Sequence, residues 1–162
     1  FSKTVTPGFR MGYLLTKDHD LLRNISTAKE AADLHTNVFA QYVIHDYLMH
    51  NELDEHLTKI RELYRSQARA MVDAMKEFFP YGVEFTIPEG GMFLWVTLPE
   101  GIFAMDLFDK ALEQNVAFVP GDPFYAEGGK RSTLRLNFTN ADEETIRSGI
   151  KRLAEVIEAE LA

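Results

Sequence analysis

Two basic residues near the start of the chain carry the first sign of chemistry: Lys3 and Arg10 stand seven residues apart, on either side of Pro7-Gly8. A lysine amine can form a Schiff base with an aldehyde, and an arginine guanidinium makes paired, charge-assisted hydrogen bonds to a phosphate. With the Ser2 hydroxyl as a further phosphate donor, the segment suits a cofactor that carries both an aldehyde and a phosphate. Each residue taken alone is more commonly a surface or turn residue, so the interpretation rests on the whole segment.

These side chains need a scaffold, and the spacing of apolar residues predicts one. We expect strands at residues 11–15, 83–87, 92–98, 116–119 and 133–138, and helices after Asp18 and at residues 36–49, 52–79, 104–114 and 143–160, the last capped by Asn140 or Asp142. The mixture predicts an α/β or α+β layered domain, in which helices cover a sheet and a long pair of helices leads into it. The strand at residues 11–15 has no obvious partner in this sequence, which indicates that another part of the protein precedes it.

The composition is that of an ordinary globular protein and narrows the function by exclusion. With 162 residues the chain can bury one core and an appendage. A net charge of −8, spread along the chain, argues against a nucleic-acid partner. The chain has no cysteine, which excludes disulfides and thiolate chemistry, and its five histidines show no metal-ligand spacing. No apolar run reaches membrane-spanning length, so we expect no membrane partner and a cytoplasmic protein.

Four sequence blocks together resemble one enzyme family. The chain opens with Phe-Ser-Lys-Thr-x-x-Pro-Gly-Phe-Arg-x-Gly-Tyr. Residues 88–95 are Pro-Glu-Gly-Gly-Met-Phe-Leu-Trp, residues 116–125 are Val-Ala-Phe-Val-Pro-Gly-Asp-Pro-Phe-Tyr, and residues 134–138 are Leu-Arg-Leu-Asn-Phe. In order and spacing they resemble the class I/II aminotransferases of fold type I, which depend on pyridoxal 5′-phosphate (PLP). Within that family the resemblance is to the 2-aminoadipate, aromatic and kynurenine aminotransferase branch, and it covers nearly the whole chain.

The resemblance implies a role for each matching residue. Lys3 would form the Schiff base with PLP and then move the proton at the substrate Cα, while Ser2 and Arg10 would bind the cofactor phosphate. Arg135 would bind the α-carboxylate of the substrate, and no metal would take part. A fixed guanidinium orients the amino acid so that its Cα–H bond stands across the cofactor plane. The implied reaction is a ping-pong transfer of an amino group from an amino acid to a 2-oxo acid.

The resemblance also implies how the chain is divided. Residues 1–30 would be the end of the large PLP-binding domain, with its last strand, residues 31–80 the connecting helices, and residues 81–162 the small C-terminal α/β domain. In the family, the groups that hold the cofactor ring lie upstream of the lysine, and two subunits of a homodimer share the site. We therefore expect this chain in isolation to be inactive, although it carries the reactive lysine.

Two other functions are compatible with the same blocks. A winged-helix transcription regulator with a PLP-binding effector domain uses the same lysine, and the sequence upstream of Phe1 would distinguish it from an enzyme. A fold-type-I PLP lyase or synthase also fits Arg135, and product analysis would separate it from an aminotransferase.

The remaining aromatic residues have a simpler interpretation. We expect Trp95, Phe103 and Phe108 in the core, and core packing rather than pocket lining for Phe93 and Phe124. The glycines at residues 90–91 are expected to shape the backbone at a strand end and to leave room near the substrate side chain.

Overall fold

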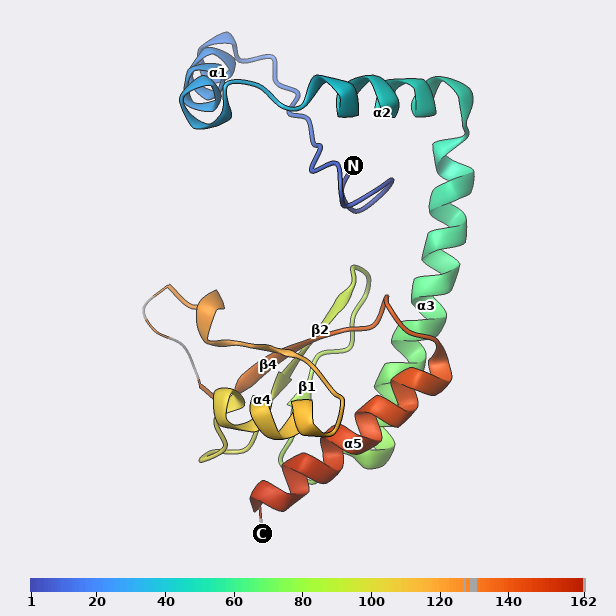
Figure 1. Cartoon of the computed structure of the whole chain (residues 1–162), viewed down its shortest axis with the longest axis vertical. Coiled ribbons are helices and arrows are strands. Elements are labelled where there is room, and N and C mark those ends of the chain that lie inside the picture. The colour runs from blue at the N-terminus through green and yellow to red at the C-terminus, as the bar shows by residue number, and fades with distance from the viewer. Residues whose placement is uncertain (127, 129–130, 162) are drawn as a thin grey trace. The chain divides into compact units, whose positions relative to one another are not determined.

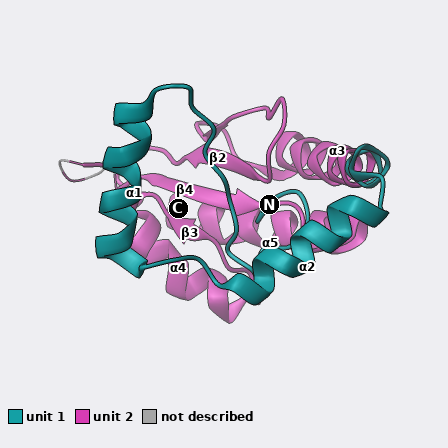
Figure 2. Ribbon diagram, turned by 90° about the horizontal axis from the view of Figure 1, so that it is seen from above, with its two compact units in different colours: residues 1–59 teal, residues 60–162 magenta. Residues whose placement is uncertain are grey.

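The structure is a computed structural model that describes residues 1–126, 128 and 131–161. It combines helices with one small sheet, which confirms the predicted mixed, layered class. Two compact units make up the chain, residues 1–59 (unit 1) and residues 60–162 (unit 2), coloured teal and magenta in Figure 2. Among the described residues, no helix is both long enough and apolar enough to cross a membrane.

Unit 1 consists of an N-terminal loop followed by helices that start at their polar caps. Helix α1 spans His19–Asp33, and the Asp18 side chain accepts two backbone N–H groups of its first turn, as the sequence predicted. Helix α2 spans Val38–His50 and is capped in the same way by Asn37. Helix α3, Leu53–Phe78, begins in unit 1 and ends in unit 2 (Figure 2).

The strand expected at residues 11–15 is absent, so that prediction was wrong. Residues 11–16 form an irregular segment, and Tyr13 and Leu15 are 81% and 89% exposed. A strand forms only when a neighbouring strand satisfies its backbone hydrogen bonds. In the described part of the chain all four strands lie together in one sheet, and none of them belongs to unit 1.

Unit 2 is built on a four-stranded antiparallel sheet with strand order β1-β2-β4-β3. The strands are β1 (Glu84–Phe85), β2 (Phe93–Thr97), β3 (Val119–Pro120) and β4 (Thr133–Asn137). The two central strands lie close to their predicted bounds, whereas the two edge strands are shorter than predicted. Strand β3 ends at Pro120, and the next residue, Gly121, still donates its N–H to the Thr133 carbonyl at 2.7 Å.

The two faces of this sheet differ in burial. The side chains of one face are buried beneath the helices: Leu94, Val96, Leu134 and Leu136. The covering helices are the end of α3, α4 (Ala104–Glu113) and α5 (Glu143–Leu161), seen together in Figure 1. Phe93, Trp95 and Arg135 alternate with the buried positions and are partly exposed, so they lie on the open face.

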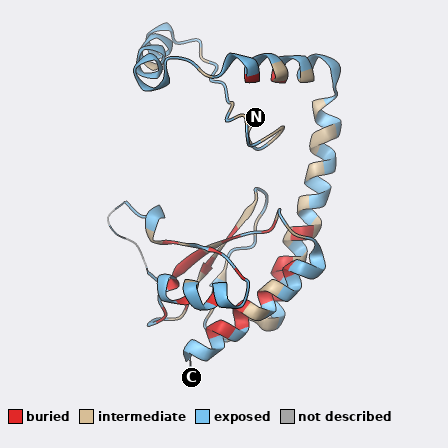
Figure 3. Ribbon diagram, in the orientation of Figure 1, coloured by how far each residue is buried: buried red, intermediate tan, exposed pale blue. Residues whose placement is uncertain are grey.

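The core of unit 2 fills the space between the covered face and its helices. Its largest fully buried side chains include Met75, Leu94, Leu107, Leu134, Phe138, Leu153 and Ile157. Figure 3 shows the buried positions in red. In unit 1, by contrast, only Ala40 and Ile44 are buried.

The last helix starts where the sequence predicted. At the start of α5, Asp142 Oδ1 accepts the backbone N–H of Thr145 at 2.8 Å, so Asp142 rather than Asn140 is the cap. A long-range contact ties the neighbouring loop to α3: Gln67 Nε2 donates to the Ala141 carbonyl at 2.7 Å. These bonds fix the direction in which α5 leaves the sheet.

The expected core positions of several aromatic residues need correction. Phe108 packs against the core as predicted, but Phe103 and Phe124 are 42% and 50% exposed. Phe103 precedes α4 as its N-cap residue, and Phe93, Trp95 and Phe124 lie outside the core cluster. Phe93 and Trp95 belong to the open face of the sheet, which α3, α4 and α5 leave uncovered.

Candidate functional site

The N-terminal loop brings the predicted cofactor residues into one closed segment. The Phe1 carbonyl accepts the backbone N–H groups of Thr4, Val5 and Thr6 at 3.2, 2.9 and 3.2 Å, which forms a tight turn around Lys3. The backbone nitrogen of Phe1 also lies 2.8 Å from the carbonyl oxygen of Met11 and brings the two ends of the loop together. Ser2, Lys3 and Arg10 therefore belong to a single hydrogen-bonded loop.

Arg10 has an unusual backbone conformation. Its N–H donates to the Pro7 carbonyl at 3.3 Å, and its φ of 52° lies in the left-handed region. For a residue other than glycine this region costs roughly 1–2 kcal/mol. Strain of this kind is concentrated at functional positions, where surrounding structure maintains it.

A cavity of about 480 Å³ lies beside Arg10. Gly8, Phe9 and Arg10 form one side, and the end of α1 and the start of α2 form the other, with Asp33 and Asn37 among the lining residues. Within the described residues Arg10 forms no ion pair, since the nearby Asp33 is bound by Lys29, at 2.7 Å to both carboxylate oxygens. The Arg10 guanidinium is therefore free to bind an anion. Ser2 and Lys3 belong to the same loop but do not line this cavity.

Arg135 occupies the open face of the sheet in unit 2. On β4 it pairs across the ladder with Trp95 of β2 and Val119 of β3. Its guanidinium carbon lies 4.0 Å from the ring centroid of Phe93 and 4.7 Å from that of Phe124. Its Nε is buried and has no hydrogen-bond partner among the described residues. The side chain is thus held by aromatic contacts and retains its capacity to bind a carboxylate.

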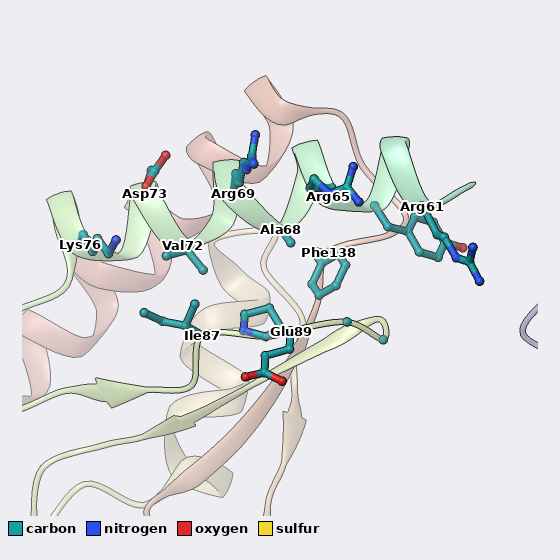
Figure 4. A pocket seen from close by; sticks show the side chains of 14 residues that line it. Arg61, Arg65, Ala68, Arg69, Val72, Asp73, Lys76, Ile87, Glu89 and Phe138 are labelled. Atoms are coloured by element: carbon teal, nitrogen blue, oxygen red, sulfur yellow. The ribbon is translucent and has the colours of Figure 1, made fainter. Parts of the chain in front are cut away.

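A cavity of about 670 Å³ in unit 2 is separate from these residues. Figure 4 shows it between α3 and the segment that carries Ile87 and Glu89. Four basic side chains of α3 line it: Arg61, Arg65, Arg69 and Lys76. Gly90 and Gly91 also border it, so the expectation that these glycines lie near a substrate side chain stays a prediction.

Each predicted site residue is now placed. Ser2, Lys3 and Arg10 share the closed loop of unit 1, and Arg135 lies on the sheet of unit 2. The aromatic contacts of Arg135 were missed by the sequence reasoning. Strict alternation along 93–97, which puts Phe93 and Trp95 on the same side of the strand, is the signal that could have indicated the contact with Phe93.

The described residues contain no cluster of three or more His, Asp or Glu side chains that could hold a metal ion. The positive groups of the predicted site residues are the Lys3 amine and the guanidinium groups of Arg10 and Arg135. This arrangement can bind anions at two places, through Arg10 and through Arg135.

The relatives that share the most sequence with this chain in the comparison below are all aminotransferases. An aromatic-amino-acid aminotransferase of Thermococcus litoralis is 47% identical over 99% of this chain and 38% of its own length. A 2-aminoadipate transaminase of Thermus thermophilus is 42% identical over the full chain and 40% of its own length. The crystal structure of a Pyrococcus horikoshii kynurenine aminotransferase in complex with PMP superposes with a TM-score of 0.92, at 47% identity, over all of this chain and 40% of that one.

Among the more distant relatives are transcriptional regulators. An HTH-type transcriptional regulator of Bacillus subtilis is 28% identical over 96% of this chain and 31% of its own length. The chain therefore spans about two fifths of the length of its similar relatives. The profile of the family described as aminotransferase class I and II matches residues 1–153, and this chain belongs to that family.

Proposed function

We propose that this chain is the lysine-bearing part of a PLP-dependent aminotransferase, which transfers an amino group from an amino acid to a 2-oxo acid by a ping-pong mechanism. The observation that carries the proposal is the closed loop of residues 1–11, which holds Lys3 and Arg10 in one hydrogen-bonded segment. A Schiff-base amine and a phosphate-binding guanidinium in one loop are what a phosphate-bearing aldehyde requires.

The residues of the loop fit that cofactor. The Lys3 side chain is exposed, and the Arg10 guanidinium borders a cavity without an ion pair in the described part of the chain. Ser2 offers a hydroxyl from the same loop. When bound, PLP supplies the electron sink for chemistry at the substrate Cα. Arg10 and Ser2 would hold its phosphate, and Lys3 would be its covalent attachment point.

Two residues of this chain would act on the substrate itself. The Lys3 amine would move the proton between the substrate Cα and the cofactor, as a general base and acid. Arg135 would bind the α-carboxylate in a bidentate pair and so fix the orientation of the amino acid. Its unneutralised guanidinium on the open sheet face supports this role.

The full-length protein would complete the site. We propose that residues 1–30 end the large cofactor-binding domain, that residues 31–80 connect it to the small domain at 81–162, and that two subunits share the site in a homodimer. The coverage supports a longer protein, because the chain matches about two fifths of each relative. Since the similar relatives are an aromatic-amino-acid aminotransferase and a 2-aminoadipate transaminase, L-phenylalanine and L-2-aminoadipate are suitable probe substrates.

The alternative of a regulator's effector domain has weaker support. The regulator relative is 28% identical, whereas the aminotransferases are 47% and 42% identical over similar lengths of this chain. A transamination assay of the full-length protein distinguishes the two, since an effector domain would bind PLP without turnover.

The test of the proposed function is Lys3→Ala in the full-length protein. We expect turnover of both probe substrates to fall below detection and the visible absorbance of lysine-bound PLP to disappear, because no other amine in the loop can replace Lys3. Lys17→Ala, which removes an exposed lysine outside the loop, is the control and should retain both signals. Retention of turnover and absorbance in the Lys3 variant would overturn the assignment.

A further inference from the structure

Arg135 is held in a different way from the other described arginines that lie over aromatic rings. Arg131 lies 5.9 Å from the Phe103 ring, and Arg147 lies 4.7 Å from the Phe78 ring and also pairs with Glu77. Of these arginines only Arg135 contacts two rings, at 4.0 and 4.7 Å, and it has no acidic partner in the described residues.

The first of the two rings is fixed by the register of the sheet. Phe93 opens β2 and pairs with Asn137, two residues beyond Arg135 on β4. Side chains on the same face of paired strands are neighbours directly and on the diagonal, so Phe93 reaches the guanidinium across the ladder. The residue directly opposite Arg135 is Trp95.

The second ring is placed by a close backbone approach. The N–H of Gly121 donates to the Thr133 carbonyl at 2.7 Å, and a Cβ at Gly121 would lie 2.0 Å from Thr133 Oγ1. Only glycine allows this contact. The short 3₁₀ helix Asp122–Phe124 follows at once and carries Phe124 over β4, where Trp95 packs edge-on against it with 5.5 Å between ring centroids.

The electrostatics of the arrangement favour an incoming anion. The face of an aromatic ring attracts a cation, yet it offers no lone pair that would compete with a carboxylate for the N–H donors. An arginine side chain also has about 2 kcal/mol of rotamer entropy, which two flanking rings reduce before a ligand arrives. Since Nε is buried, the terminal nitrogens are the donors left for a ligand.

We propose that Phe93 and Phe124, the aromatic pair, are positioning residues that orient the Arg135 guanidinium for the α-carboxylate of the substrate. The inference rests on the proposed function, since it assigns Arg135 to that carboxylate. It gives the aromatic pair a role in substrate binding through Arg135, which differs from a place in the core.

The test uses the full-length holoenzyme and whichever of L-phenylalanine and L-2-aminoadipate it turns over faster, together with the α-amide of that amino acid. The amide lacks the charged group that Arg135 would bind. We expect Phe124→Leu and Phe93→Leu each to lower kcat/KM for the amino acid about tenfold, mainly through KM, and to leave kcat/KM for the amide nearly unchanged. Discrimination between acid and amide should therefore fall by the same factor.

Conservative and control variants separate the aromatic contact from packing. Phe124→Tyr keeps a ring over the guanidinium and should retain the discrimination of the unmodified enzyme. Phe103→Leu removes a partly exposed phenylalanine that lies over a different arginine, Arg131. It should leave kcat/KM for the amino acid and for its amide unchanged. Because Phe124 is half exposed, its leucine variant should fold, and its thermal unfolding provides the check.

Arg135→Gln distinguishes a failure of this inference from a failure of the proposed function. If Arg135→Gln keeps the discrimination between acid and amide, Arg135 does not bind the carboxylate and its proposed role falls. If Arg135→Gln loses the discrimination while both leucine variants keep it, the role of Arg135 stands and the aromatic pair does not position it. Equal losses for acid and amide in the leucine variants would also overturn the inference, because they indicate a general packing defect.

Discussion

The two units of the chain bury their apolar side chains to very different extents. Unit 2 has a continuous core between the sheet and α3, α4 and α5, whereas unit 1 buries only Ala40 and Ile44 and α1 buries no residue at all. In unit 1, Phe39 and Tyr42 of α2 remain 73% and 70% exposed. Folding stability comes mainly from apolar burial, so the stability of this chain should reside in unit 2.

The same difference applies to the residues that carry the proposed chemistry. Arg135 stands on a strand whose other face is packed into the core, and its position is set by the register of the sheet. Lys3 is held by a few backbone hydrogen bonds within a loop. Segments with few buried contacts open most easily, so the geometry of Lys3 depends on its surroundings more than that of Arg135 does.

The largest expected effect is a loss of folding stability when a core side chain of unit 2 is truncated, and it tests the difference in burial between the two units. Met75 is fully buried in unit 2, so Met75→Ala should lower the free energy of unfolding by about 2–5 kcal/mol. The chain has a single tryptophan, Trp95, which lies in unit 2, so its fluorescence during urea unfolding reports that unit. Ile44→Ala, at a buried position of unit 1, should leave the Trp95 transition unchanged. A similar shift in both variants would show that the units unfold together and would remove the contrast.

The next effect compares a tightly packed glycine of unit 2 with a glycine of unit 1 that has open space around it. Gly121→Ala would place a methyl group 2.8 Å from the Thr133 carbonyl oxygen, besides its clash with the hydroxyl, and should cost about 1–3 kcal/mol. The measurement is thermal unfolding of both variants. Gly12→Ala in unit 1 has no atom within 4 Å of the new Cβ and should leave the unfolding temperature unchanged. An unaffected Gly121 variant would mean that the 3₁₀ turn can shift at little cost.

The smallest effect concerns the helix caps and their pH dependence. Hydrogen bonds from the side chain and the backbone N–H of Thr145 hold the pKa of Asp142 below its ordinary value. Since the pKa is lower in the folded state, the stabilisation is present above the unfolded-state pKa of about 3.9 and is lost as the pH falls through the folded-state pKa. Asp142→Asn should flatten this part of the acid unfolding curve of unit 2, followed by Trp95 fluorescence.

The matched control for that cap lies in unit 1. Asp18→Asn changes the cap of α1 in the same way and should leave the acid unfolding curve of Trp95 as it is. If Asp18→Asn flattens the curve equally, the charge of the whole chain rather than the cap of α5 determines its acid stability.

Local signals predicted the helices well. Caps such as Asp18 and Asp142 and apolar residues spaced by three or four positions are properties of a short stretch of sequence. Helix α1 starts after Asp18 as expected, and α2 to α5 start and end within a few residues of the expected positions. The strands depended on partners that are distant in sequence. Within the described residues the apolar run at 11–15 has no neighbouring strand to pair with, so it is irregular.

The site shows the same division. The motif around Lys3 and the block around Arg135 could be assigned a role from residue types and family resemblance. The contacts of Arg135 could not, because Phe124 reaches it through a turn whose path depends on the approach of Gly121 to Thr133. Hydrophobicity alone assigned Phe124 to the core, but its ring lies on the open face, half exposed over a charged side chain.

The alternation along β2 also has an evolutionary consequence. Leu94 and Val96 are confined by the core, whereas Phe93 and Trp95 face away from it and contribute to the surroundings of Arg135. If Arg135 has its proposed role, substitutions at the first set of positions would test folding, and substitutions at the second set would change ligand preference while the fold persists. A strand of this kind would let a protein change its ligand preference at every second residue, without rebuilding the interior.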